Sequence, residues 1–458
     1  MPHFEKSCEY SASVETLFQW HKRPGAFERL APPWESIRVI EQSGGIENGG
    51  RLAFEVSKYG FPVRWTAVHQ DYVENKQFCD VQESGPFNRW KHTHSFEPTD
   101  NGSRLTDSVD YELPGGIFGS ALGGGYAHSI LERMFRFRHT RTAYDLARHG
   151  CFAQERPWKI AISGSSGLIG SQLAAFLTTG GHTVYRLVRR APIIEQNEIY
   201  WNPQTGKIDE RLLDGLDAVV HLAGEGIASR RWTEEQKLVI RKSRTDGTHL
   251  IAEALAKLDN KPRVLISASA TGFYGDRGDE ELSENAAKGK GFLSDVCYAW
   301  ESSATPALDA GIRVVHPRIG IVLTPQGGAL AKMLPAFQFG VAGPLGDGAM
   351  FMGWISLDDL IGVLCVCIFN DSLHGPINAV SPNPVTNLSF TKTLGSVLNR
   401  PTLLPAPKFA IKVALGELGT SLLLQSAKVI PTQLNTADYK FHHPTLEQAL
   451  REELGLFS

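Results

Sequence analysis

Residues 159–170 read Lys159-Ile160-Ala161-Ile162-Ser163-Gly164-Ser165-Ser166-Gly167-Leu168-Ile169-Gly170, and an apolar run from Leu173 to Leu177 follows. The first residues are typical of a short buried strand, and three glycines spaced three apart open a segment with helical periodicity. In such a strand, turn and helix, Gly164 permits the tight turn, Gly167 lets a ligand approach the backbone, and Gly170 lets helix and strand pack closely. Free N–H groups at the helix N-terminus suit phosphates, so the segment predicts a dinucleotide site, although such glycines also serve plain turns.

His182 to Arg190 is interpreted as the second strand, whose end holds the adenosine ribose in dinucleotide-binding folds. A carboxylate at that point would accept a hydrogen bond from the 2′-hydroxyl of NAD. The sequence instead has Arg189 and Arg190, and a guanidinium offers a planar cationic fork to a 2′-phosphate. The expected cofactor is therefore NADP, with a solvated arginine pair as the alternative interpretation.

Length and composition limit the classes to which the protein can belong. At 458 residues the chain exceeds what one hydrophobic core usually organises, so at least two domains are expected. With 42% apolar residues, 21% charged residues and a formal charge of −3, it gives no reason to expect nucleic acid or an anionic membrane as a partner. Met1 to Lys6 lacks a signal-peptide core and no apolar run reaches the roughly 18 residues of a membrane span, so a cytoplasmic location is expected.

The cysteines show no C-x-x-C spacing. Buried free thiols in a reducing compartment are the expected state, so neither a disulfide framework nor a cysteine metal site is predicted. The positions are Cys8, Cys79, Cys151, Cys297, Cys365 and Cys367.

Residues 1–150 do not alternate strand and helix. A short helix at Val14–Trp20, a series of strands and a long helix at Tyr126–Arg148 are expected instead. The strands are Phe4–Tyr10, Ile37–Ile40, Arg51–Ser57, Val63–Tyr72, Gln77–Gln82, Trp90–Phe96 and Arg104–Glu112. The pattern predicts a curved antiparallel sheet wrapped around the helix, with the Gly-rich stretch Gly115–Gly125 as a mobile entrance.

Histidines and aromatic residues crowd this part of the chain. His92 and His94 share one face of a strand, and imidazoles are common metal ligands. No third ligand with persuasive spacing appears, so no metal is predicted. Packed or cavity-lining side chains are the preferred interpretation.

From residue 157 strands and helices alternate, which predicts a parallel, doubly wound α/β sheet. The expected elements are strands Asp217–Leu222, Arg263–Ala268 and Arg313–His316 and helices Glu234–Leu258 and Leu293–Ala307. After Gly328, shorter helices and one strand at Ile377–Val380 are expected to form a small cap. The predicted domains are residues 1–150, 157–386 and 387–455.

Two strand ends carry groups for chemistry. The first reads His221-Leu222-Ala223-Gly224-Glu225, where small residues suit the close approach of a nicotinamide ribose. Arg244, on the helix beyond, is placed to turn back to a phosphate. A solvated basic face, shared with Arg230, Arg231 and Arg241, is an equal alternative.

The second strand end reads Ser267-Ala268-Ser269-Ala270-Thr271-Gly272-Phe273-Tyr274-Gly275-Asp276. It resembles the active-site strand end of extended short-chain dehydrogenases/reductases, which implies that Ser269 hydrogen-bonds a substrate oxygen. A hydroxyl that caps backbone is the alternative.

Those enzymes normally add a Tyr and a Lys four residues on, and the Lys lowers the Tyr pKa for proton exchange. Alignment on Glu301 puts Leu293 and Cys297 at these positions, so the usual pair is absent. Tyr274 is the candidate replacement acid/base, with a packed ring as the alternative, and Glu225 is a further group within reach.

Further motifs identify one branch of this group. They are Arg230–Glu235, Phe273–Gly278, Gly327–Met333, Gly343–Gly346, Trp354-Ile355 and Ala379–Asn387. Together they resemble the YfcH-like epimerase family of atypical short-chain dehydrogenases/reductases over residues 159–455. The family's C-terminal domain of unknown function is matched at about Asn387–Leu454.

This resemblance implies a Rossmann-type sheet and NADP binding. The predicted cofactor residues are Gly164, Ser166, Gly167, Leu168, Ile169, Gly170, Arg189, Leu222, Ala223, Gly224, Arg244, Arg318 and Val322. The substrate is not implied, because the family name comes from relatives that keep the tyrosine.

Residues 1–150 resemble the N-terminal extension of some family members, an α+β helix-grip fold like that of START and polyketide-cyclase domains. Trp20–Leu30, Gly85–Phe87 and the residues Trp90, His92 and His94 carry this resemblance. The fold commonly holds an apolar ligand between sheet and helix, which is the partner expected here.

Two functional classes stay open. The first is an NADP-dependent oxidoreductase or epimerase-like enzyme whose acid/base group has been relocated. The second is an NADP(H)-binding sensor or regulatory protein with little or no catalysis. A missing acid/base group typically costs about 10²- to 10⁴-fold in rate, so the sequence does not separate slow catalysis from none.

Overall fold

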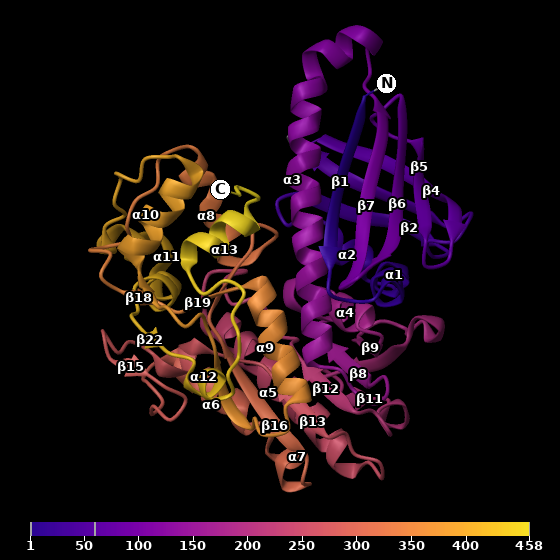
Figure 1. Ribbon diagram of the computed structural model, residues 1–458. Helices are drawn as coiled ribbons and strands as arrows, with labels where there is room; N and C mark the ends of the chain where they lie inside the picture. Colours follow the sequence, from indigo (N-terminus) through magenta and orange to yellow (C-terminus); the bar gives the residue numbers. More distant parts are fainter. Residues whose placement is uncertain (1, 59–60, 458) are drawn as a thin grey trace. The chain divides into compact units, whose positions relative to one another are not determined.

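The computed structural model describes residues 2–58 and 61–457 (Figure 1). The chain divides into two compact units, with the boundary between Ala153 and Gln154; residues 175–181 and 457 group with the first unit. Within the described ranges, no helix is long and apolar enough to cross a membrane.

The first unit, as far as it is described, combines an antiparallel sheet with two short helices and one long helix. The strand order is β1-β7-β6-β5-β4-β3-β2. The elements are β1 (His3–Tyr10), α1 (Val14–Lys22), α2 (Ala26–Leu30), β2 (Ser36–Ser43), β3 (Arg51–Lys58), β4 (Phe61–Val73), β5 (Gln77–Ser84), β6 (Arg89–Thr99), β7 (Gly102–Glu112) and α3 (Gly116–Cys151). Figure 1 shows α3 running along one face of this sheet.

Alternating burial accounts for the sheet. In the middle of β6 and through β7 every second residue is buried, including His92, Leu105 and Val109. Such a period of two gives a strand one inward face. The inward face packs on α3, where Phe4 stacks on Phe135 with ring centroids 5.3 Å apart. The predicted curved antiparallel sheet with a long helix is confirmed.

The long helix begins earlier than the sequence predicts. α3 starts at Gly116 rather than Tyr126, so the stretch Gly115–Gly125 is helical from Gly116 on. The stretch is therefore helical rather than a loop, and its role as a mobile entrance stays a prediction. Each glycine lowers helix stability by about 1 kcal/mol relative to alanine, which is why the sequence pattern placed the start of the helix after these glycines.

The second unit contains the parallel sheet. Its strand order is β11-β10-β9-β8-β12-β13-β16-β14, with β20 also paired to β16. The strands are β8 (Lys159–Ser163), β9 (Thr183–Val188), β10 (Glu198–Asn202), β11 (Lys207–Ile208), β12 (Ala218–His221), β13 (Val264–Ser267), β14 (Ser269–Ala270), β16 (Arg313–Ile319) and β20 (Gly375–Ala379). The chain moves outward from β8 to β10 and returns beside β8 as β12, with parallel pairing throughout this path. The predicted doubly wound sheet is confirmed, and its switch point lies between β8 and β12.

Helices and small strand pairs complete the second unit. The helices are α4 (Leu168–Thr179), α5 (Glu234–Lys257), α6 (Phe292–Ser302), α7 (Thr305–Asp309), α8 (Gly328–Gln338), α9 (Leu357–Phe369), α10 (Asn387–Leu398), α11 (Lys408–Leu423), α12 (Thr432–Thr436) and α13 (Leu446–Glu453), with 3₁₀ turns η1 (Ile194–Gln196), η2 (Glu210–Leu212) and η3 (Thr271–Tyr274). The strand pairs are β15 (Glu281–Leu282) with β22 (Lys428–Val429), β17 (Ile321–Leu323) with β19 (Trp354–Ser356), and β18 (Phe351–Met352) with β21 (Val385–Thr386).

The second unit differs from the sequence prediction in two places. The helix expected over Leu293–Ala307 is divided into α6 and α7, and Pro306 lies in the first turn of α7, where it has no N–H to continue a helical ladder. The segment after Gly328 contains several strands rather than one. Most of these have two or three residues, too few for a periodic pattern to be detected.

The cysteines are free, as expected, but they are not uniformly buried. Cys79, Cys297, Cys365 and Cys367 are buried, whereas Cys8 is half-buried and Cys151 is exposed. Cys151 is the last residue of α3, beyond the part of the helix that the sheet covers. The expectation of buried thiols is wrong at that position.

A buried ion pair joins α2 to α3. Arg29 Nε donates to Asp145 Oδ2 at 2.8 Å and its Nη2 donates to Oδ1 at 2.6 Å, and neither side chain is more than 1% exposed. Asp145→Ala leaves the guanidinium buried without this carboxylate, so we expect the first unit to lose about 3–5 kcal/mol of stability in urea unfolding followed by fluorescence. Glu9→Ala, which removes an exposed pair with Arg104, is the control. Equal losses in both variants would contradict this role for the buried pair.

Candidate functional site

The glycine-rich turn joins β8 to α4 at the switch point of the sheet. Gly164 has φ of +72°, and a Cβ there would lie 3.0 Å from Ala223 N. A Cβ at Gly170 would lie 2.2 Å from Gly164 O, so neither position accepts a side chain. Gly167 is exposed, and a Cβ there would lie 3.2 Å from Gly164 O. The turn is therefore packed on its inner side and open where the first N–H groups of α4 lie.

A serine and a histidine fasten the ends of β8 and β12 beside this turn. The Ser163 hydroxyl accepts hydrogen bonds from Leu222 N at 3.2 Å and Ala223 N at 3.4 Å, and it lies 2.6 Å from His221 Nδ1. Burial and the charge of Arg244 lower the pKa of His221 to about 4, so its ring is neutral. With two amides on its lone pairs, the hydroxyl has its proton available for Nδ1. This arrangement fixes two of the loops that the sequence assigns to the cofactor.

The two arginines after β9 have different surroundings. Arg190 Nη1 and Nη2 donate to the Glu198 carboxylate at 2.7 and 2.5 Å, and this ion pair lowers the pKa of Glu198. Arg189 is exposed and has no hydrogen bond or ion pair to any residue in the described ranges. Arg189 is thus the arginine that is free to meet a ligand.

The N-terminus of α8 lies close to the glycine-rich turn. A Cβ at Gly327 would lie 3.5 Å from Leu168 Cδ2, and one at Gly328 would lie 3.8 Å from Val322 O. The structure therefore brings together Leu168 and Val322, two predicted cofactor residues that are far apart in the sequence. Lys332 of α8 donates to Ala228 O at 3.2 Å, which connects this helix to the loop after β12.

Arg244 of α5 helps to hold the loop after β12 in place. Its Nη1 donates to Glu225 O at 3.1 Å and to Ile240 O at 3.0 Å, and its guanidinium lies 5.0 Å from the centroid of the Trp300 ring. Burial lowers its pKa. Unlike Arg230, Arg231 and Arg241, which are exposed, Arg244 does not belong to a solvated basic face.

Ser269 is the first residue of β14, just beyond the end of β13, and lies in a buried charged cluster. Its Oγ donates to Glu301 Oε1 at 2.6 Å, and Glu301 also accepts from Arg318 Nε and Nη2, each at 2.9 Å. The guanidinium stacks on the Phe273 ring, 3.5 Å from its centroid. Arg318 was predicted to be a cofactor residue, but its guanidinium N–H groups donate hydrogen bonds to other residues of the protein. In the sequence, Glu301 was only the reference residue for finding the usual Tyr and Lys positions. No local motif indicates that it is a partner of Ser269.

Tyr274 is fully buried on the other side of Arg318. Its hydroxyl donates to Asn378 Oδ1 at 2.6 Å and accepts from Arg318 Nη1 at 2.9 Å. Burial raises its pKa despite the adjacent guanidinium. Asn378 N in turn donates to Glu284 Oε1 at 3.1 Å. These surroundings fit a packed ring, the alternative interpretation of Tyr274, better than a group that exchanges protons with a ligand.

The face of α6 where a Tyr and Lys pair would lie is apolar. A Cβ at Gly272 would lie 3.4 Å from Leu293 Cβ and 3.8 Å from Cys297 Sγ, so both side chains reach the strand end as the alignment on Glu301 predicts. Burial raises the pKa of Cys297 to about 11, which keeps the thiol neutral. Neither residue can exchange a proton near neutral pH.

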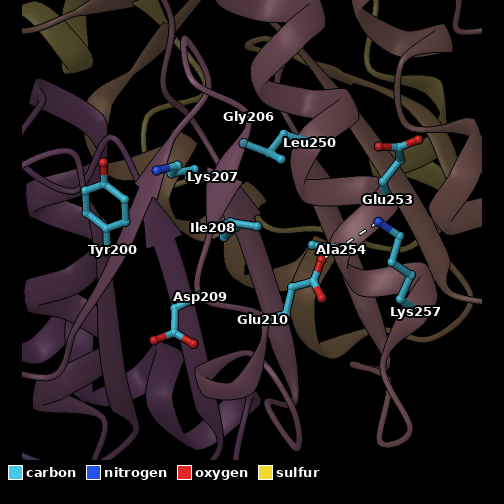
Figure 2. A pocket seen from close by; sticks show the side chains of 10 residues that line it. All are labelled: Tyr200, Gly206, Lys207, Ile208, Asp209, Glu210, Leu250, Glu253, Ala254 and Lys257. Atoms are coloured by element: carbon cyan, nitrogen blue, oxygen red, sulfur yellow. Dashed lines mark ion pairs between the residues drawn. The ribbon is translucent and has the colours of Figure 1, made fainter.

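A surface pocket lies elsewhere, between the β10–β11 hairpin and the C-terminal part of α5 (Figure 2). Both basic and acidic side chains line it, and Lys257 Nζ lies 3.8 Å from Glu210 Oε1. α5 begins beyond the carboxyl end of β12, so its C-terminal part lies toward the opposite edge of the sheet. Because parallel sheets bind ligands at their carboxyl edge, this pocket is outside the candidate site.

A second polar cluster lies inside the first unit. Asp80 of β5 and Asp107 of β7 lie beside His92 and His94 of β6. The sequence did not predict these two partners, because strand register rather than sequence spacing places them there. Burial opposes charge on His94, but Asp107 and Asp80 outweigh it and raise its pKa to about 9. Burial likewise opposes charge on both carboxyl groups, yet the histidines hold their pKa values well below the usual range.

Known protein families match separate parts of the chain. Residues 10–136 match the polyketide cyclase / dehydrase and lipid transport family. Residues 160–295 match the NAD dependent epimerase/dehydratase family. Residues 406–453 match a domain of unknown function, DUF1731.

Relatives extend these matches over most of the chain. An epimerase family protein of Mycobacterium bovis is 44% identical over 291 residues, which cover 64% of this chain and 96% of the relative. The crystal structure of a nucleoside-diphosphate sugar epimerase from Corynebacterium glutamicum is 34% identical with a TM-score of 0.82, covering 99% of this chain and 90% of that one. The human epimerase family protein SDR39U1, crystallised with NADPH, is 31% identical with a TM-score of 0.60, covering 65% of this chain and 99% of that one.

Proposed function

The chain belongs to the epimerase family, and on that premise we propose that its second unit is an NADP(H)-dependent oxidoreductase or epimerase-like enzyme that acts on a hydroxyl or carbonyl group of a small molecule. The observation that carries the proposal is the open glycine-rich turn at the N-terminus of α4, with the unpaired Arg189 at the end of β9. The human relative crystallised with NADPH supports this choice of cofactor.

The residues present fit a phosphorylated dinucleotide. In this proposal Gly167 and the first turn of α4 bind the pyrophosphate, and Arg189 binds the 2′-phosphate. Leu222, Ala223 and Gly224 approach the nicotinamide ribose, since Ser163 and Arg244 hold that loop from behind. NADPH supplies a hydride when it is bound. Arg318 and Arg244 act on the site through the loops they support rather than by contact with the cofactor.

Ser269 and Glu301 are the proton-transfer pair in this proposal. The Ser269 hydroxyl already donates to Glu301 at 2.6 Å. A substrate hydroxyl can therefore pass its proton to Oγ as Oγ passes its own to the carboxylate, and the same pair returns a proton to a carbonyl oxygen in reverse. Arg318 orients the carboxylate with two hydrogen bonds and is in this sense a positioning residue.

A catalytically weak or inactive NADP(H)-binding sensor is the second candidate. Leu293 and Cys297 at the usual acid/base positions and the burial of Tyr274 favour it. The two candidates share the cofactor and differ in whether Ser269 has a chemical role.

The first unit is proposed to bind a small apolar ligand. Its match to the polyketide cyclase / dehydrase and lipid transport family supports this, as does an aromatic cluster in which the partly buried rings of Trp65 and Phe87 pack against buried rings. There Trp65 and Trp90 pack edge to face with centroids 5.0 Å apart. A cytoplasmic location stays a prediction of the sequence.

The 2′-phosphate assignment predicts a selective loss. Hydrogen bonds to charged groups contribute about 1.5–3 kcal/mol, so Arg189→Ala should weaken NADPH binding by roughly ten- to a hundredfold and leave NADH binding nearly unchanged. Titration of nucleotide fluorescence measures both affinities. Arg190→Ala is the matched control, because that side chain is committed to Glu198 and should change NADPH affinity by less than about threefold. Equal losses for both nucleotides in Arg189→Ala rule out the assignment.

Catalysis through Ser269 predicts a difference between two hydroxyl deletions. The parent protein, given NADP⁺ or NADPH and a cellular small-molecule extract, should change the extract in a way that mass spectrometry detects. Ser269→Ala should reduce this change by about 10²- to 10⁴-fold, the usual loss of a positioned proton donor. Tyr274→Phe should keep activity within a few-fold of the parent. If Ser269→Ala and the parent change the extract equally, the sensor is the better account.

Ligand binding by the first unit predicts uptake of an apolar fluorescent probe by the full chain. Trp65→Ala removes one ring of the aromatic group and should weaken probe binding at least severalfold, since buried aromatic area dominates such affinities. Tyr126→Ala, at an exposed position on α3, is the control. A parent protein that takes up no probe would favour a purely structural role for this unit.

A further inference from the structure

The register of four neighbouring strands gathers ionisable side chains on the helix-covered face of the first unit's sheet. Asp80 of β5 pairs with His92 of β6 and with His69 of β4. His94, two residues beyond His92 on the same face, pairs with Asp107 of β7. Side chains paired directly across strands lie on one face within about 5.5 Å at Cβ, so this grouping follows from the pairing itself.

From these contacts we propose that Asp80, His92 and His94 bind a divalent transition metal ion of the Zn²⁺ or Fe²⁺ type. Asp80 Oδ2 lies 3.2 Å from His94 Nε2 and 3.6 Å from His92 Nδ1. Ligand atoms about 2.1 Å from a tetrahedral ion lie about 3.4 Å from one another. The two distances to Asp80 are close to this value, and all three ligand atoms lie within 4.8 Å of one another. At 3.6 Å the His92 contact is too long for a hydrogen bond, so no hydrogen bond joins His92 Nδ1 to the carboxylate.

The atoms that face away from the proposed ion are held by a second set of groups. Asp107 Oδ1 lies 2.8 Å from His92 Nε2 and 2.8 Å from His94 Nδ1, and Asp107 Oδ2 lies 2.6 Å from His139 Nε2 of α3. On the other side, His69 Nε2 lies 2.7 Å from Asp80 Oδ1. Metal-binding histidines commonly present their second nitrogen to a carboxylate, which fixes the ring and its tautomer. Asp107 does this for His92 through a hydrogen bond, and it lies beside His94 Nδ1 as an ion-pair contact.

Burial and ligand type limit which metal ions fit this site. The His92 and His94 side chains are 3% and 7% exposed, whereas Asp80 is 24% exposed and is the one of the three that reaches solvent most. Phe78 stacks on His94 with centroids 4.1 Å apart, and Phe135 packs edge to face on His92 at 5.1 Å. Two imidazoles disfavour Mg²⁺ and Ca²⁺, which prefer oxygen ligands. Three protein ligands leave a coordination position for water or for an oxygen atom of a bound small molecule.

A direct test is metal binding by the full-length protein after removal of bound ions with a chelator. Zn²⁺ titrated by calorimetry should bind with one equivalent in the first unit, and Co²⁺ should give visible absorption bands typical of low-coordinate imidazole ligation. Asp80→Asn and His92→Gln should each weaken Zn²⁺ binding by about a hundredfold or more, beyond the loss usual for a supporting residue. Circular dichroism establishes that each variant is folded.

The control lies in the second unit. His442, His443 and Glu452 form another group of possible ligands, in which Glu452 Oε2 lies 3.0 Å from His443 Nε2. Glu452→Gln should leave the site in the first unit intact. The proposal is overturned if the parent binds no Zn²⁺ at micromolar concentration, or if Glu452→Gln abolishes binding while Asp80→Asn and His92→Gln retain it. A variant that fails to fold leaves the parent measurement and the Glu452→Gln control to decide.

Discussion

The close contact between the ends of β8 and β12 is the constraint on which the proposed nucleotide site depends. Gly164 approaches the backbone of Ala223 so closely that a Cβ there would lie 3.0 Å from the amide nitrogen. Ser163 Oγ and His221 Nδ1, at the ends of the same two strands, lie 2.6 Å apart. Because these two strands flank the switch point, the contact sets the position of the helix N-terminus on one side and of the loop after β12 on the other.

A chain of buried polar groups extends from the end of the parallel sheet near Ser269 to β20. It runs from Ser269 through Glu301, Arg318 and Tyr274 to Asn378, with each neighbour at 2.6–2.9 Å. Breaking a buried ion pair costs about 3–5 kcal/mol because the remaining charge has no partner, so these groups hold one another in place. This mutual dependence fixes the hydroxyl of Tyr274 between Arg318 and Asn378, whereas the hydroxyl of Ser269, at the other end of the chain of contacts, is bound to Glu301 alone among the described residues.

Local patterns predicted much of this structure, and long-range pairing accounts for what they missed. The glycine spacing predicted the turn before α4, alternation predicted the strands of the first unit, and the sequence around Glu301 predicted an apolar face on α6. The partner of Arg190, Glu198, and the role of Asp80 depend instead on which strands lie side by side. No pattern within one segment contains that information, because register is set by hairpins and crossovers of the whole fold.

A crystal structure of the complex with NADP⁺ measures most directly where the nucleotide binds. We expect pyrophosphate oxygens within hydrogen-bond distance of the backbone N–H groups at the start of α4 and the 2′-phosphate on the Arg189 guanidinium. The nicotinamide should then lie beside Gly224 and Ser269. A nucleotide bound in the pocket beside Lys257, or a 2′-phosphate remote from Arg189 with the turn at Gly167 unused, would contradict the proposed site.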